Sequence, residues 1–265
     1  MRRHWKDGTF VNKDDPQQTS DYDPFRLIQI LTRKITPSRI LFILNVFATV
    51  VFQLAIAFGL TALVTQVYDI SYFALSYNII LYVISAIYFS LEFIWAFVRR
   101  ISMVFPWNLV YLLVMTILSS IIIAAESLAY YDDVPLIVFA FIWVMLQVVV
   151  SFAIFIPNDF TQTWLTRIVN VVYTVTILGG QIAFFVRKQT KVALLIAGAV
   201  GFPCSCYLLT KEVKWIFGQG TYYYPENNIV KPARNIYGYC WSLFLTVMWI
   251  YSPFGMRNET IQSGR

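Results

Sequence analysis

Residues 135–155 read PLIVFAFIWVMLQVVVSFAIF, a stretch of 21 residues without a charged side chain. A transmembrane α-helix needs about 20 mostly apolar residues to cross the hydrocarbon core of a bilayer. Lipid then serves as the solvent for the outer faces of such a helix. The stretch therefore predicts a membrane span over about 134–156.

Six further segments meet the same requirement, and together the seven predict an all-α membrane protein, a seven-transmembrane-helix bundle. The last segment is the weakest, because it begins with the charged sequence KPAR and contains Gly238 and Ser242. The connections are short, which favours antiparallel packing of successive helices in one bundle. The other spans are expected at about 39–65, 73–98, 106–129, 166–186, 191–217 and 232–253.

The composition of the 265 residues agrees with a membrane protein: 58% are hydrophobic, 13% are charged, and the mean hydropathy is +0.64. A water-soluble fold of this length would expose apolar patches far larger than soluble monomers tolerate. Tyrosine and tryptophan, present 17 and 8 times, suit the headgroup level of a bilayer. The lipid bilayer is therefore the first expected partner.

The expected organisation is a polar cytosolic tail over 1–35, a seven-helix membrane domain over 36–253 and a short C-terminal tail over 254–265. No cleavable signal peptide is expected, because the first residues are polar. Eight of the twenty basic residues precede Ile40 and none lies in the first connection, which indicates a cytosolic N-terminus. Three basic residues at 187–191 break this alternation, so the topology of the C-terminal part stays open.

The net charge of +6 is attributed to membrane topology and contact with anionic lipid, and no nucleic-acid partner is expected. The three cysteines have no zinc-ligand spacing, and His4 is the only histidine. No cofactor or metal site is expected, and paired catalytic acids are missing, so the chain is not expected to be an enzyme. A ligand receptor of seven helices would need a loop disulfide, yet no cysteine precedes Cys204.

Charged residues within the apolar segments are candidates for function, because a charge in a bilayer is costly. Glu92 lies seven residues before Arg99, on the same helix face. Glu212 follows Lys211 directly, and two adjacent residues point about 100° apart on a helix, so we expect them to pair poorly. Glu212 would then seek a cation on another helix, and Arg99 is the candidate for such a latch. Solvated charges at helix ends are the simpler alternative.

A second group of acids follows the third span. Glu126 lies near its end, and Asp132 and Asp133 occupy the connection to the fourth span. Acidic groups at one membrane face concentrate cations, so these three residues are candidates for attracting calcium. An ordinary acidic loop is the simpler alternative.

Short motifs in consistent order over roughly residues 33–250 resemble the Bax-inhibitor/lifeguard family of membrane proteins. Arg99 and Arg100, followed by FPWNL, are similar to the junction of that family's second and third helices. The other matching motifs are QL at 53–54 with FG at 58–59, SLAYYDDVPLIV at 127–138, DFT at 159–161, and Gly218 followed by PE at 225–226 and ARNIY at 233–237.

The resemblance implies a Bax-inhibitor-like seven-helix bundle with a cytosolic N-terminus, in membranes of the endoplasmic reticulum or Golgi. It also implies modulation of intracellular calcium through a pH-sensitive leak channel and negative regulation of apoptosis. Calcium would be the permeant ion, and membrane-bound apoptosis regulators would be partners.

By this resemblance, only some of the family's site residues have counterparts in this chain. The arginine pair falls on Arg99 and Arg100, the sixth-helix aspartate falls on Glu212, and the seventh-helix aspartate falls on Tyr239, where the carboxylate is lost. Two carboxylates in one site share a proton, and a single glutamate has no such partner. A latch here is therefore expected to stay closed over ordinary pH or to lose its proton gating. A non-conducting membrane scaffold or regulator is the alternative function.

Overall fold

The computed structural model describes residues 4–6, 9–11, 37–67, 78–97, 106–130, 133–155, 163–186, 191–218, 224–226 and 228–255. They belong to two compact units, Met1–Pro37 and Ser38–Arg265. In the first unit, strands β1 (His4–Lys6) and β2 (Thr9–Val11) pair antiparallel, with His4 opposite Val11. The segment expected to be only a polar tail thus contains a short hairpin.

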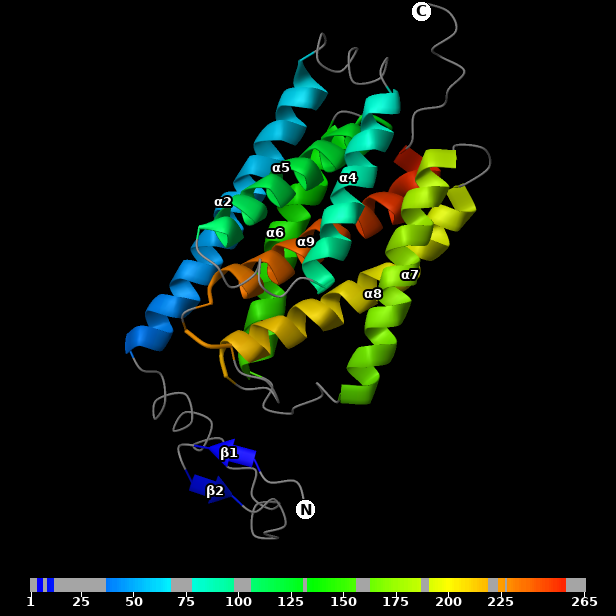
Figure 1. The fold of residues 1–265 in the computed structure, drawn as a ribbon. Coiled ribbons are helices and arrows are strands. Elements are labelled where there is room, and N and C mark those ends of the chain that lie inside the picture. Colours follow the sequence, from blue (N-terminus) through cyan, green and yellow to red (C-terminus); the bar gives the residue numbers. More distant parts are fainter. Residues whose placement is uncertain are drawn as a thin grey trace, which may run out of the picture. The chain divides into compact units, whose positions relative to one another are not determined.

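The second unit is helical, and each of the seven apolar segments expected from the sequence forms a helix (Figure 1). Five of these helices, α2, α5, α6, α7 and α8, are long and apolar enough to cross a membrane. The chain is therefore an integral membrane protein. The helices are α2 (Pro37–Gln66), α4 (Asn78–Phe97), α5 (Trp107–Ser127), α6 (Asp133–Phe155), α7 (Thr163–Val186), α8 (Lys191–Ile216) and α9 (Val230–Gly255).

Helix α6 shows how the sequence pattern becomes a membrane helix. Its buried residues recur every three or four positions, so one face packs against the other helices. The opposite face carries large apolar side chains that remain exposed, such as Ile137 (65%) and Val144 (56%). In water such a face would be unstable, whereas lipid solvates it.

Helix α9 is the most enclosed element of the unit. It packs against α5, α6 and α8 and lies among them in Figure 1. Its side chains are buried on nearly every side, although its composition is less apolar than that of the five spanning helices. The surrounding helices, rather than lipid, shield its polar groups. A helix in such a place can be less apolar, which explains why this segment is the weakest candidate span in the sequence.

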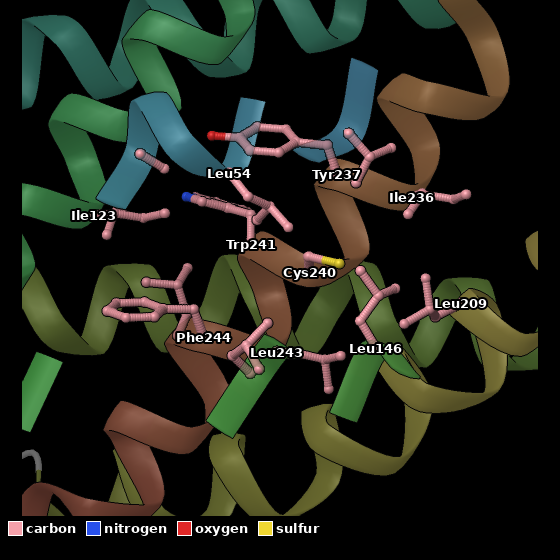
Figure 2. Close-up of a cluster of buried hydrophobic side chains, with 14 of the residues drawn as sticks. Leu54, Ile123, Leu146, Leu209, Ile236, Tyr237, Cys240, Trp241, Leu243 and Phe244 are labelled. Atoms are coloured by element: carbon pink, nitrogen blue, oxygen red, sulfur yellow. The ribbon is translucent and has the colours of Figure 1, made fainter. Parts of the chain in front are cut away.

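The core is built around α9 (Figure 2). Its Phe244 ring lies 4.6 Å from the Phe139 ring of α6, and its Trp241 ring lies 5.4 Å from the Tyr88 ring of α4, measured between centroids. Figure 2 shows side chains of four other helices gathered around the same turns of α9: Leu54 from α2, Ile123 from α5, Leu146 from α6 and Leu209 from α8.

Helices α8 and α9 approach closely because α8 carries glycines where they meet. A Cβ atom at Gly198 would lie 2.7 Å from the carbonyl oxygen of Thr246 and 2.9 Å from the backbone nitrogen of Ile250. A Cβ atom at Gly201 would lie 2.7 Å from the Thr246 methyl group. Small residues let helix backbones approach closely in membranes, where helix association depends on packing.

We expect Gly198→Ala to lower the free energy of unfolding in detergent by about 1–3 kcal/mol, because the added methyl group would clash with backbone atoms of α9. Thermal unfolding of the purified protein measures the change. Gly179→Ala on α7 is the matched control, because a Cβ atom there would meet nothing within 4 Å. Equal stability of the two variants would contradict the proposed close packing.

Candidate functional site

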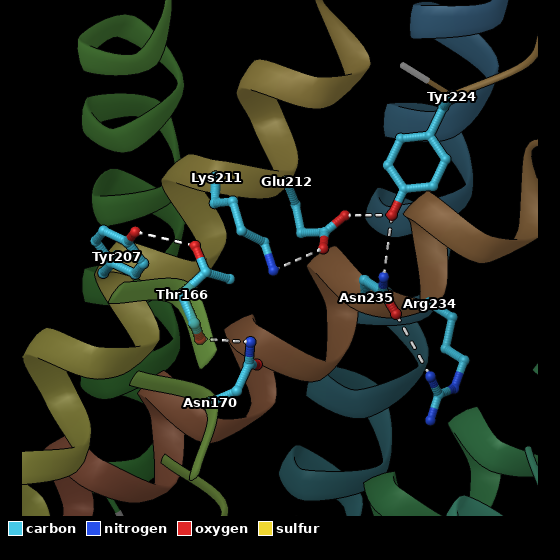
Figure 3. Close-up of polar contacts among 8 residues, drawn as sticks. All are labelled: Thr166, Asn170, Tyr207, Lys211, Glu212, Tyr224, Arg234 and Asn235. Atoms are coloured by element: carbon cyan, nitrogen blue, oxygen red, sulfur yellow. Dashed lines mark hydrogen bonds and ion pairs between the residues drawn. The ribbon is translucent and has the colours of Figure 1, made fainter. Parts of the chain in front are cut away.

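The Glu212 carboxylate lies near the C-terminal end of α8 and is buried, with 1% of the residue exposed. The Tyr224 hydroxyl donates a hydrogen bond of 2.6 Å to its Oε2 atom. The Lys211 Nζ atom lies 3.4 Å from its Oε1 atom. Each carboxylate oxygen thus has one partner, as a buried charge requires (Figure 3).

The expectation that Lys211 and Glu212 pair poorly was wrong. Their backbone positions diverge around the helix, but the long lysine side chain bends back to the carboxylate (Figure 3). Lys211 itself is buried, at 4% exposure, and its Nζ atom lies 4.5 Å from the centroid of the Trp215 ring. An ammonium group in this position gains from both the carboxylate and the aromatic face.

Tyr224 links Glu212 to the start of α9. It lies in the connection between α8 and α9, and its hydroxyl oxygen accepts a hydrogen bond of 3.2 Å from Asn235 Nδ2. Burial and the neighbouring Glu212 carboxylate raise the pKa of Tyr224 above its usual value. The phenol therefore keeps its proton and remains the donor to the carboxylate.

Arg39, at the start of α2, binds the backbone of Tyr224 and the C-terminal end of α8. Its guanidinium donates to the carbonyl oxygens of Tyr224 at 2.6 Å and of Trp215 at 3.2 Å, and also to that of Ile216. The carbonyls at the end of a helix lack partners within the helix, and a cation there complements the helix dipole. Arg39 is 3% exposed and lies over the Phe42 ring, 4.6 Å from its centroid.

The sequence interpretation missed Arg39. It is the last of the eight basic residues before Ile40, whose number indicates only the orientation of the N-terminus. Basic residues are common at this position as interfacial anchors. Nothing in the local pattern separates an anchor from a residue that caps a helix 176 positions away.

Glu92 pairs with an arginine of another helix, a contact that the sequence analysis does not predict. Its carboxylate forms an ion pair with Arg234 on α9. Arg234 also contacts Asn235 Oδ1 at 3.4 Å, so polar contacts run from α4 through α9 to Tyr224 and Glu212. Arg99 and Arg100, the expected latch arginines, lie outside the described residues.

Tyr239, where the resembling family carries its second acid, packs among aromatic rings. Its ring lies 5.6 Å from that of Tyr173, edge to face. The Tyr173 hydroxyl in turn donates to Ser242 at 3.0 Å. In the described part of the chain, Glu212 is bound by Tyr224 and Lys211, and Tyr239 is not among its partners.

The three acids considered for attracting calcium do not share one environment. Glu126 is buried in α5, at 3% exposure, whereas Asp133 is exposed at the start of α6. Asp132 lies outside the described residues. Within the described ranges, no three His, Cys, Asp or Glu residues are grouped so that they could hold a metal ion.

We expect Tyr224→Phe to lower the free energy of unfolding by about 1.5–3 kcal/mol, because it removes the hydrogen bond to a buried carboxylate. The raised pKa of Tyr224 means that this contribution is present below about pH 10, the usual value for tyrosine, and is lost only above it. Unfolding of the variant and wild type at about pH 6 and about pH 8 should therefore give the same difference. Tyr251→Phe, at a 43% exposed position, is the control and should change little.

Arg39→Lys is expected to destabilise the protein by about 2–4 kcal/mol, because one ammonium group cannot reach all the carbonyls that the guanidinium fork serves. Thermal unfolding in detergent measures this loss. Arg167→Lys, at an exposed position of α7, makes the same chemical change and should be neutral. A neutral Arg39→Lys would mean that positive charge alone suffices at this site.

Comparisons with known proteins identify no protein that is similar to this chain. No family model, no curated protein and no solved structure matches the chain. The function must therefore be argued from the chain's own residues.

Proposed function

We propose that this chain is a multi-pass membrane protein of the Bax-inhibitor/lifeguard type that modulates intracellular calcium and negatively regulates apoptosis. The ordered motifs at 53–59, 99–109, 127–161 and 218–237 support this proposal. The proposal includes seven spanning helices, a cytosolic N-terminus and a location in the endoplasmic reticulum or Golgi. Calcium is the permeant ion, and membrane-bound apoptosis regulators are partners.

The buried Glu212 carboxylate is the observation that carries the calcium proposal. A carboxylate inside a helical membrane bundle is costly to bury and is therefore a candidate for part of an ion pathway. Here Lys211 and Tyr224 neutralise and hold it, so the pathway is closed at this end of the bundle. Removing the negative charge would leave Lys211 buried without its partner, which favours opening.

Arg39 and Asn235 position the segment that would have to move. Both bind Tyr224, one through its backbone carbonyl and the other through its hydroxyl. Release of Tyr224 from Glu212 would therefore loosen the connection between α8 and α9 while Arg39 still holds the end of α8. A gate of this kind involves few residues and leaves the helices intact.

A non-conducting scaffold or regulator is the second candidate. Two observations favour it: the second acid of the family's site is replaced by Tyr239, and the basic side chains of Lys211 and Arg39 are buried at the same end of the bundle. Positive charge along a narrow path repels a divalent cation. The fold would then be kept for protein contacts within the membrane.

Calcium flux into liposomes that contain the purified protein distinguishes the two functions. If the chain conducts, we expect only a small wild-type flux, because Lys211 and Tyr224 hold the Glu212 carboxylate and keep the latch closed. Glu212→Gln should raise the flux several-fold by releasing Lys211 and Tyr224. Asp133→Asn, at the exposed start of α6, removes one negative charge outside the latch, so its effect on the flux should be much smaller than that of Glu212→Gln.

Two results would oppose the calcium proposal. If neither wild type nor Glu212→Gln exceeds empty liposomes, the chain does not conduct, and the scaffold function stands. If Asp133→Asn changes the flux as much as Glu212→Gln does, the effect comes from surface charge and the Glu212 gate is wrong.

A further inference from the structure

A second buried carboxylate lies far from the Glu212 site. Glu126 is the penultimate residue of α5, and only 3% of it is exposed. In the described part of the chain, neither of its oxygens has a hydrogen-bond partner. An ionised carboxylate in such a place is costly to bury, so it calls for a neutralising positive charge.

Two side chains from other helices surround this carboxyl group. Gln181 of α7 and Trp249 of α9 lie close enough to interact with it. They are 2% and 0% exposed, and the amide nitrogen and oxygen of Gln181 and the Trp249 indole nitrogen also lack hydrogen-bond partners. Gly180 makes room for the arrangement, because a Cβ atom there would lie 2.3 Å from the Trp249 ring.

The chemistry of these neighbours suits a neutral carboxylic acid better than a metal ion. The Trp249 indole can only donate, and the Gln181 amide offers two N–H donors and one carbonyl acceptor. A protonated carboxyl group accepts with one oxygen and donates with the other, which matches this set. A cation would gain only the amide oxygen and would face the N–H groups, and calcium prefers six to eight oxygen ligands.

Among the described residues, Tyr130, Asp133 and Lys191 do not replace the proton at this end of the bundle. Tyr130 is buried in the turn after α5, and burial and the nearby Glu126 raise its pKa, so it stays neutral. Asp133 at the start of α6 and Lys191 at the start of α8 are exposed. The Lys191 carbonyl lies at the end of α9, where it accepts a hydrogen bond of 3.5 Å from Ser252.

We propose that Glu126, with Gln181 and Trp249, forms a second proton-binding site at the end of the bundle opposite Glu212. Trp249 lies about 21 Å along α9 from Asn235, at 1.5 Å per residue, so the two sites are separate. Loss of the proton would place a charge among α5, α7 and α9 and draw water into that end of the bundle. The site thus binds and releases a proton independently of any calcium flux.

Infrared spectroscopy of the purified protein in lipid tests the site directly. We expect a carbonyl band of a protonated carboxylic acid that persists near pH 7, shifts in D₂O and is missing from Glu126→Gln. Asp and Glu side chains normally lose their protons at about pH 4, so ordinary carboxyl groups do not contribute to this band at pH 7. Glu212→Gln removes a carboxyl group from the other site and should keep the band, even if the chain conducts no calcium.

Trp249→Phe keeps the ring and removes the indole N–H, so it should shift the band to higher frequency without abolishing it. Three outcomes would overturn the proposal: a spectrum at pH 7 without a band that depends on Glu126, a band that sodium or potassium salts remove at constant pH, and a band that Trp249→Phe leaves unmoved. The second outcome would identify a site for an alkali cation. Glu126→Gln has the shape of the protonated acid, so it should fold normally.

Discussion

The Arg39 guanidinium connects the start of the helical unit to residues 176 to 185 positions later in the sequence. It binds the last carbonyls of α8 and the backbone of Tyr224, and Tyr224 in turn binds Glu212. The helix end and the carboxylate would each be costly to bury without these partners. The beginning of α2, the end of α8 and the beginning of α9 are thereby joined around one aromatic residue.

The buried acidic residues at the two ends of the bundle are stabilised in different ways. At the Glu212 end, two acids on described helices have a basic partner: Lys211 for Glu212 and Arg234 for Glu92. At the Glu126 end, amide and indole groups surround the acid, which fits a neutral form. The ion-paired arrangement is stable only while each acid keeps its basic partner. The arrangement around Glu126 is stable only while the carboxyl group keeps its proton.

The sequence predicted all seven helices, because apolar length and short connections are local properties. It also placed Glu212 among the important residues, because an acid within an apolar segment is rare. It did not predict the partners of the charges, which depend on how helices rotate and pack. The backbone angle between Lys211 and Glu212 does not reveal that the lysine side chain bends back to the carboxylate. The contacts of Arg39 with the end of α8 and of Glu92 with Arg234 join residues 176 and 142 positions apart, so no local pattern contains them.

The glycines of α7 and α8 have a consequence for how the protein can move. Gly180 of α7 packs against the Trp249 ring, and Gly198 and Gly201 of α8 pack against Thr246 and Ile250 of α9, so sliding of one helix past another would cause collisions of backbone and ring atoms. These three helices should therefore shift as one rigid body. Any change of shape would then be a rotation of this body against α2, α4, α5 and α6.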